Sequence, residues 1–265
     1  MSRKDLIAIS MPCFGTSDLT KTNAYKLANI LGVTFKEINI KDAVTQHFKD
    51  INQDINNYDV TYENAQARER TQVLMDIANK ENGLVVGTGD LSELALGFAT
   101  YNGDHMSNYA VNTSIPKTLA RLLINYEAKR SKNKALRDVL YSIGTTPVSP
   151  ELIPPKDGEI SQITEDLVGP YELHDYFIYY GLHLGYSPSK VYRVACYSFN
   201  KKYSNETIKY WLKNFYRRFF TQQFKRSCLP DGVKAIPFSF SPRGDFMMPS
   251  DASSNSWLKE IEKIV

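Results

Sequence analysis

Residues 83–104 constrain the fold of this chain more than any other stretch. A short apolar run, Leu84-Val-Val, is followed by a turn, Gly87-Thr-Gly-Asp. Such a run is typical of a strand in a parallel sheet that is covered on both faces, so we expect it to be buried. Asp90 and Glu93 have the spacing of a helix N-cap and its reciprocal partner, which predicts a helix from about Leu91.

This predicted strand, turn and helix also mark a possible ligand site. In open α/β sheets, ligands bind beyond the carboxyl ends of the strands, where the next helix begins. Thr88, Asp90 and Glu93 therefore lie where a nucleotide could reach them. The alternative is that Glu93 only caps a helix, and the stretch by itself leaves both interpretations open.

Length and composition limit the class of protein. The 265 residues, 42% of them hydrophobic, can bury a full core as one large α/β domain or as a domain with a helical appendix. The net charge of +3 is too small to indicate a nucleic-acid or membrane surface. Cys13, Cys196 and Cys228 are far apart, which favours reduced thiols and a cytoplasmic protein. No segment approaches the ~18 apolar residues of a membrane span.

The N-terminal part has the pattern of a βαβ unit. Strands are expected at residues 6–11 and 33–40, with a helix at 20–31 between them that stops at Gly32. A further helix is expected at 64–79. Its two arginines, Arg68 and Arg70, lie near the expected helix start, where they either attract an anion or are solvated surface charge.

The remainder of the chain is increasingly helical. Pro116 predicts a helix start that places Lys117 in the first turn. Four prolines in 145–155 end regular structure, and the polar, acidic residues 156–169 are expected to form a mobile lid loop. Beyond them the apolar spacing is helical. Residues 217–226 interleave basic and aromatic side chains, which fits helical core packing, a basic lip to a phosphate ligand or a single-strand binding surface.

Seven motifs in order resemble the NAD synthetase family, specifically the synthetase part of its glutamine-dependent branch. They span nearly the whole chain and include Tyr62-Glu-Asn-Ala-Gln-Ala-Arg, Gly87-Thr-Gly-Asp-Leu-Ser-Glu and Gly97-Phe-Ala-Thr-Tyr. The other four are residues 11–18, 111–118, 224–227 and 241–245. Tyr101 stands where the ammonia-dependent branch has a lysine, which favours the glutamine-dependent branch.

The resemblance implies a fold and an activity. The fold is α/β, a Rossmann-like doubly wound parallel sheet of the adenine nucleotide alpha hydrolase-like, ATP-pyrophosphatase type, with a C-terminal helical extension. Residues 1–155 are then the nucleotide-binding domain, 156–169 the lid and 170–265 the helical extension. The activity implied is that of a ligase: ATP adenylates the carboxylate of deamido-NAD, and ammonia displaces AMP to give NAD.

The resemblance also implies roles for individual residues. Lys117 is the expected catalytic, phosphate-contacting group, and Glu93 is the expected magnesium ligand, so ATP and Mg²⁺ are the expected cofactors. Thr88, Lys117 and Ser149 are expected to bind ATP. The residues expected to bind deamido-NAD are Asn64, Arg68, Glu93, Phe98, Ala99, Thr100, Tyr101 and Lys225. Family members are homo-oligomers, so Lys225 is expected to close the site of a neighbouring subunit. Neither nucleic acid nor membrane is an expected partner.

Two family features are not found in this sequence. They are the Ser-Gly-Gly-x-Asp-Ser pyrophosphate loop and the N-terminal glutaminase domain that releases ammonia. We therefore expect a truncated synthetase that lacks its first strand and makes no appreciable NAD alone. The alternatives are a catalytically dead nucleotide-binding or assembly scaffold and, less favoured by the motifs, another ATP-pyrophosphatase such as an asparagine or GMP synthetase.

Overall fold

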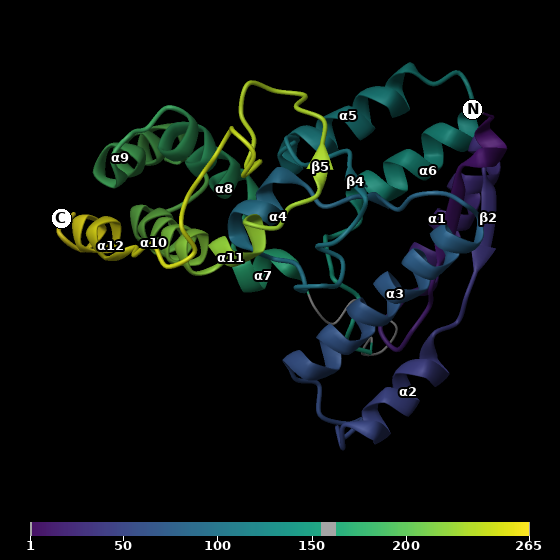
Figure 1. Cartoon of the computed structure of the whole chain (residues 1–265). Helices are drawn as coiled ribbons and strands as arrows, with labels where there is room; N and C mark the ends of the chain where they lie inside the picture. The colour runs from purple at the N-terminus through teal and green to yellow at the C-terminus, as the bar shows by residue number, and fades with distance from the viewer. Residues whose placement is uncertain (1, 155–162, 265) are drawn as a thin grey trace. The chain divides into compact units, whose positions relative to one another are not determined.

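The computed structural model describes residues 2–154 and 163–264 (Figure 1). Its described residues form two compact units. The first is drawn from Met1–Leu84, Asn102–Asp104 and Ala120–Thr164, and the second from Val85–Tyr101, His105–Leu119 and Glu165–Val265. Both units combine helices with parallel strands, which confirms the predicted α/β class.

The first unit begins with the predicted βαβ pattern. Its elements are η1 (Arg3–Asp5), β1 (Ile7–Ser10), α1 (Asp18–Leu31), β2 (Thr34–Glu37), α2 (Lys41–Asp50), α3 (Val60–Lys80) and α6 (Lys134–Thr145). Strands β1 and β2 pair in parallel, with Ile7 opposite Thr34. Helix α1 ends at Gly32, whose φ of 70° is the left-handed conformation that a glycine C-cap supplies without strain.

Helix α3 starts earlier than predicted, and this changes the interpretation of its arginines. Asp59 caps the helix by accepting hydrogen bonds from the amides of Thr61 and Tyr62. Arg68 and Arg70 therefore lie near the middle of α3, so the expectation that they flank a helix start is wrong. The Arg70 Nε donates to the Met11 carbonyl at 3.3 Å, which gives that side chain a structural role.

The core of the first unit packs α2 against α3. Phe48 and Tyr62 stack with ring centroids 5.2 Å apart, surrounded by Ile40, Val44 and Ala65. Both rings are almost fully buried, and aromatic residues bury more area than any other side chains. This cluster is therefore an apolar core of the first unit.

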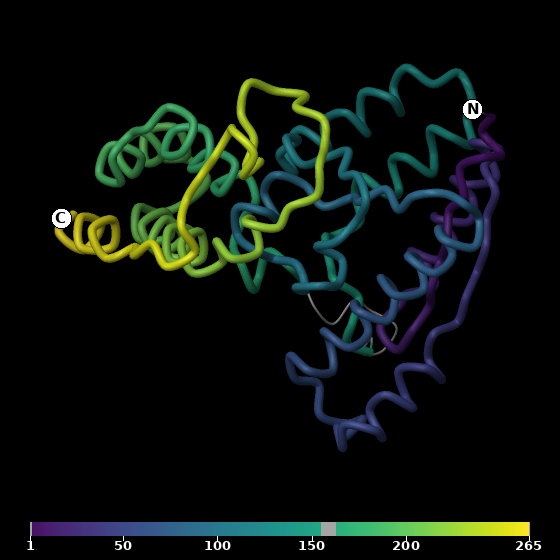
Figure 2. The backbone as a smooth tube through the Cα atoms, in the orientation of Figure 1, coloured from purple at the N-terminus to yellow at the C-terminus, as the bar shows by residue number. Residues whose placement is uncertain are grey.

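The second unit contains a three-stranded parallel sheet and most of the helices. Its elements are β3 (Val86–Gly87), α4 (Leu91–Leu96), β4 (Tyr109–Ala110), α8 (Tyr171–Phe177), the π-helical η2 (Ile178–His183), α9 (Pro188–Phe199), α10 (Asn205–Thr221), α11 (Gln223–Arg226), β5 (Asp231–Gly232) and α12 (Asn255–Glu262). The sheet order is β3-β4-β5. Figure 2 shows the chain leaving α11, passing through β5 and following an irregular path to α12. Helices α5 (Lys117–Arg130) and α7 (Thr164–Val168) have residues in both units.

The apolar run before α4 is less buried than predicted. Val85 is 8% exposed, but Leu84 and Val86 are 60% and 44% exposed. Successive residues of an extended chain point to opposite faces, so only Val85 faces the core. The expectation of a strand covered on both faces is therefore wrong at Leu84 and Val86.

The helices after residue 170 form the core of the second unit. Helix α10 packs against α8, α9 and α12. Val191, Ile208, Leu212 and Phe215 are fully buried, which confirms the predicted helical spacing. Residues 155–162, which include half of the predicted lid loop, lie outside the described residues, and most of the other half belongs to α7. Within the described ranges, no helix combines the length and apolar character needed to cross a bilayer.

His174 is a buried histidine in the middle of this helical core. Its Nε2 donates to the Val168 carbonyl at 2.7 Å, and its ring stacks on Phe215. Burial lowers the pKa of His174 to about 4, although the bond to Val168 opposes the shift. The imidazole is therefore neutral in the folded protein near neutral pH.

We predict that His174 makes the second unit sensitive to acid. Its folded pKa is lowered, so its stabilising contribution is complete above the unfolded pKa of about 6.5 and is lost as pH falls toward 4. The full loss is about 3 kcal/mol. Urea unfolding at pH 7.5 and 5 can be followed by fluorescence, because both tryptophans, Trp211 and Trp257, belong to this unit.

The variant His174→Phe tests the cause. It should lose about 1 kcal/mol at pH 7.5 through the missing hydrogen bond, but much of the acid sensitivity should disappear. The control His47→Gln changes an exposed histidine in the first unit and should behave like the original chain. Equal acid sensitivity of His174→Phe and the original protein would contradict the assignment.

Candidate active site

The start of α4 carries two carboxylates that satisfy the helix end reciprocally. The Asp90 Oδ1 accepts a hydrogen bond from the Glu93 amide at 2.9 Å, and the Glu93 Oε2 accepts from the Asp90 amide at 3.0 Å. This is the predicted capping box, and it leaves the second oxygen of each carboxylate available. Glu93 is thus a cap, as the alternative interpretation held, and its Oε1 has a further partner.

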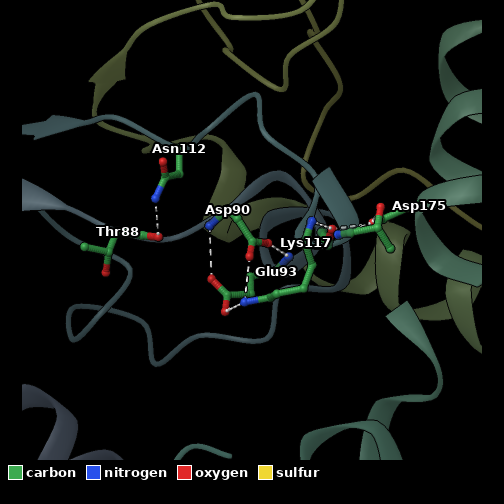
Figure 3. Close-up of polar contacts among 8 residues, drawn as sticks. Thr88, Asp90, Glu93, Asn112, Lys117 and Asp175 are labelled. Carbon is green, nitrogen blue, oxygen red and sulfur yellow. Dashed lines mark hydrogen bonds and ion pairs between the residues drawn. The ribbon is translucent and has the colours of Figure 1, made fainter. Parts of the chain in front are cut away.

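That further partner is Lys117, the first residue of α5. Its Nζ lies 2.6 Å from the Asp90 Oδ2 and 2.6 Å from the Glu93 Oε1, as Figure 3 shows. The same ammonium lies over the Tyr171 ring, 5.2 Å from its centroid. The structure therefore brings together Glu93 and Lys117, two predicted site residues of opposite charge.

Burial changes the proton affinity of this cluster. The Asp90 side chain is only 5% exposed, and burial raises the pKa of its carboxyl group, with a further contribution from Glu93 that Lys117 opposes. Burial alone would lower the pKa of Lys117, but the two carboxylates outweigh it and the net pKa is raised. Lys117 therefore remains an ammonium at neutral pH and compensates the buried negative charge.

A partly buried hydrogen-bond network fixes the backbone of Lys117. The Lys117 amide donates to the Ser92 Oγ at 2.8 Å. Asp175 of α8 accepts hydrogen bonds from the Ser92 hydroxyl and, at 2.9 Å and 2.6 Å, from the amide and hydroxyl of Thr118. The beginning of α5 is thereby joined to α4 and to α8.

The end of α4 is held by arginines from α10 and α11. The Arg226 Nη1 donates to the Leu94 and Ala95 carbonyls, each at 3.1 Å, and the Arg218 Nε donates to the Leu96 carbonyl at 3.0 Å. Cations that bind the last carbonyls of a helix satisfy acceptors with no partner inside the helix. Arg226 is 1% exposed, so the basic side chains of 217–226 do not all form a surface lip.

Lys225 extends this arrangement to the predicted substrate segment. Its Nζ donates to the Gly97 and Ala99 carbonyls, each at 2.7 Å, within the same chain. Gly97 has φ of 60°, and a Cβ there would lie 2.2 Å from the Gln222 Cβ, so only glycine fits. The turn between α4 and Phe98 is therefore fixed by the hydrogen bonds from Lys225 and by the close packing of Gln222 against Gly97. The predicted role of Lys225 across a subunit interface stays a prediction.

The segment after this turn presents aromatic side chains. Tyr101 is 39% exposed, and its ring packs on His105 and Phe224 with centroids 5.2 Å and 5.4 Å away. The Arg218 guanidinium lies over the Phe98 ring, 5.9 Å from its centroid. Flat, partly exposed rings of this kind can stack on a planar heterocycle.

The other predicted residues fall into two groups. Thr88 lies in the turn before α4, where its carbonyl accepts from the Asn112 Nδ2 at 3.3 Å (Figure 3). Asn64, Arg68 and Ser149 belong to the first unit, which is described by itself. There, the Ser149 Oγ accepts from the Glu151 amide, and the Glu151 carboxylate binds the hydroxyls of Ser17 and Thr20 at the start of α1.

Several residues of the site were not predicted as functional. Asp90 was predicted as a helix cap within reach of a nucleotide, but its ion pair with Lys117 was not predicted. Ser92, Thr118, Asp175 and Tyr171 have no local signal, because their contacts join distant parts of the chain. Among the described residues, no group of three or more His, Cys, Asp or Glu side chains is arranged to hold a metal ion.

Comparisons with known proteins identify the family to which this chain is similar. The family model described as "NAD synthase" matches residues 1–146. The chain is 42% identical over 287 residues to the glutamine-dependent NAD(+) synthetase of Mycobacterium leprae, covering 99% of this chain and 42% of that protein. It is 29% identical to the enzyme of the same name from Aquifex aeolicus, covering 94% of this chain and 40% of the relative. The chain thus spans about 42% of the length of the first of these relatives.

Solved structures show the same fold. A glutamine-dependent NAD(+) synthetase from Cytophaga hutchinsonii superposes with a TM-score of 0.78 at 22% identity, covering 96% of this chain and 40% of that one. An NMN synthetase from Francisella tularensis gives a TM-score of 0.57 at 20% identity, with 80% and 75% covered. These likenesses confirm the Rossmann-like α/β class. The family match over residues 1–146 and the 42% identity show that the chain belongs to the NAD synthase family.

Proposed function

We propose that this chain contributes to the ATP-dependent amidation of deamido-NAD to NAD. The observation that carries the proposal is the contact of Lys117 with Asp90 and Glu93 at the start of α4, in a chain 42% identical to a glutamine-dependent NAD(+) synthetase. In this reaction a carboxylate oxygen of the substrate attacks the α-phosphorus of ATP, and pyrophosphate leaves. Ammonia then attacks the acyl carbon, and AMP leaves with the bonding electrons.

Each group of the second unit has a role in this proposal. Lys117 neutralises negative charge that develops on the transferred phosphoryl group, and Thr88 contributes to the ATP site. The segment 98–101 binds the nicotinate ring through its aromatic side chains. Lys225 holds that segment in place by donating hydrogen bonds to the Gly97 and Ala99 carbonyls.

The donor set also fits Mg²⁺. This ion is typically bound through one or two carboxylates together with water and phosphate oxygens, and Asp90 and Glu93 supply such carboxylates. When bound, Mg²⁺ would neutralise phosphate charge and orient the leaving group. Lys117 now contacts both carboxylates, so these groups must share or exchange partners when a divalent cation and ATP bind.

The direct test is binding and turnover by the chain itself. Calorimetry with ATP–Mg²⁺ and with deamido-NAD should show saturable binding of each, and an NAD assay with ammonium as the nitrogen source measures amidation without a glutaminase. Binding of neither ligand would overturn the proposal. Binding without NAD formation is the result that the sequence analysis predicts for this chain alone, and appreciable NAD formation by the chain alone would contradict that prediction.

The variant Glu93→Gln separates the cap from the chemistry. Glutamine still accepts from the Asp90 amide, so the helix start should persist and stability should fall by no more than about 1 kcal/mol. Removing the charge should weaken Mg²⁺-dependent ATP binding by about 10- to 100-fold. Glu262→Gln, which changes a surface carboxylate paired with Lys213, is the control and should bind as the original chain does. Unchanged ATP–Mg²⁺ binding by Glu93→Gln would remove this residue from the metal site.

We further propose that the chain forms a homo-oligomer through α5. Three of its apolar side chains are exposed in the described chain: Leu122 by 64%, Leu123 by 50% and Tyr126 by 63%. Contiguous apolar surface of this kind marks interaction sites.

Light scattering at micromolar concentration should give the mass of at least a dimer, and Leu122→Glu should shift the measured mass toward that of the monomer. Met247→Glu, at a position 79% exposed, should not. A monomer mass for the original chain would contradict the proposal.

A further inference from the structure

Asp175 is a partly buried carboxylate outside the residues that the proposed reaction uses. Both of its oxygens accept hydrogen bonds: Oδ1 from the Ser92 hydroxyl, and Oδ2 from the amide and hydroxyl of Thr118. Burial raises the pKa of Asp175, and the bonds from Ser92 and Thr118 oppose the shift. A carboxylate placed in such surroundings is costly unless its hydrogen bonds are complete.

The helix that Asp175 caps differs from others in this chain. Helices α1, α6, α9 and α10 receive their caps from the residue directly before them, namely Ser17, Asn133, Ser187 and Ser204. The residue before α5 is Pro116, whose side chain has no hydrogen-bonding group. The first amides of α5 are bound instead by Ser92 of α4 and by Asp175 of α8.

This arrangement fixes the position of Lys117 from two sides. Its amide donates to the Ser92 hydroxyl, which in turn donates to Asp175, and the Thr118 amide donates to Asp175 directly. A negative group at the start of a helix is also favoured by the partial positive charge of the helix dipole. The ammonium at the end of the Lys117 side chain lies 2.6 Å from a carboxylate oxygen of Asp90 and 2.6 Å from one of Glu93.

We propose that Asp175 is the positioning residue for Lys117. By holding the first turn of α5 against α4, it sets where the ammonium lies relative to Asp90 and Glu93. This inference rests on the proposed function for the role of Lys117 toward ATP. It makes α8, part of the helical C-terminal region, a component of the nucleotide site, although none of its carboxylates need touch the nucleotide.

Two substitutions separate positioning from folding. Asp175→Ala removes all three acceptor contacts, whereas Asp175→Asn keeps an acceptor for Thr118 and removes the charge. The control is Glu172→Gln, which changes a carboxylate on the same helix that binds Lys202 and Tyr203 instead. Urea unfolding by tryptophan fluorescence establishes which variants are folded, and all binding is measured on folded protein.

The first readout does not depend on ATP. Hydrogen exchange of the Thr118 amide and acylation of the Lys117 amine by an amine-reactive ester both report whether the first turn of α5 is fixed. Asp175→Ala should raise both rates at least about 10-fold, Asp175→Asn should raise them less, and Glu172→Gln should leave them unchanged. If Asp175→Ala does not fold, the rates measured for Asp175→Asn decide whether Asp175 positions Lys117. Exchange of the Thr118 amide and acylation of the Lys117 amine at the rates of the original chain, in the folded variants, would overturn the inference.

The second readout links positioning to the nucleotide. Calorimetry with ATP–Mg²⁺ should show binding weakened by about 10- to 100-fold in Asp175→Ala, with no change in Glu172→Gln. Reduced stability with original ATP affinity would reduce Asp175 to a structural residue and would also overturn the inference. If the original chain itself does not bind ATP–Mg²⁺, the proposed function fails, while the exchange and acylation rates still decide whether Asp175 positions Lys117.

Discussion

The second unit depends on the charged groups that hold the two ends of helix α4. This helix has six residues, which is too short to be stable in water by itself. Asp90, Glu93 and Lys117 hold its first turn, and Arg218 and Arg226 bind its last carbonyls. Glu93 lies in the helix and the segment 98–101 follows it, so both candidate ligand-binding groups have the position that these contacts impose.

The local features of this region could be predicted from the sequence. The spacing of Asp90 and Glu93 indicated the capping box, and Pro116 indicated the start of α5, because caps and helix starts depend on a few adjacent residues. The strand-helix-strand pattern of residues 6–40 was equally local. The family motifs added the separate roles expected of Lys117 and Glu93, which periodicity could not have supplied.

The contacts between distant residues could not be predicted in the same way. Asp175 and Thr118 are 57 positions apart, and Arg226 and Leu94 are 132 apart, so no window of sequence contains both partners. The exposure of Leu84 and Val86 depends on which face of a short strand is covered. The predicted position of Arg68 near a helix start was wrong because Asp59 caps α3 several residues before the apolar spacing begins. These errors concern tertiary packing and element boundaries, where local propensity has the least influence.

The position of β5 in the sheet has a consequence for biosynthesis. Strands β3 and β4 lie before residue 111, but β5 (Asp231–Gly232), which pairs with β4, follows α8 to α11 in the sequence. The two strands are in close contact, because a Cβ on Gly232 would lie 2.2 Å from the Ala110 carbonyl oxygen. All residues of the first unit have left the ribosome's catalytic centre by residue 164. At the usual rate of translation, several more seconds pass before β5 is made. Until then β4 lacks the strand that pairs with it in the folded protein, and an unpaired strand edge can associate with another chain.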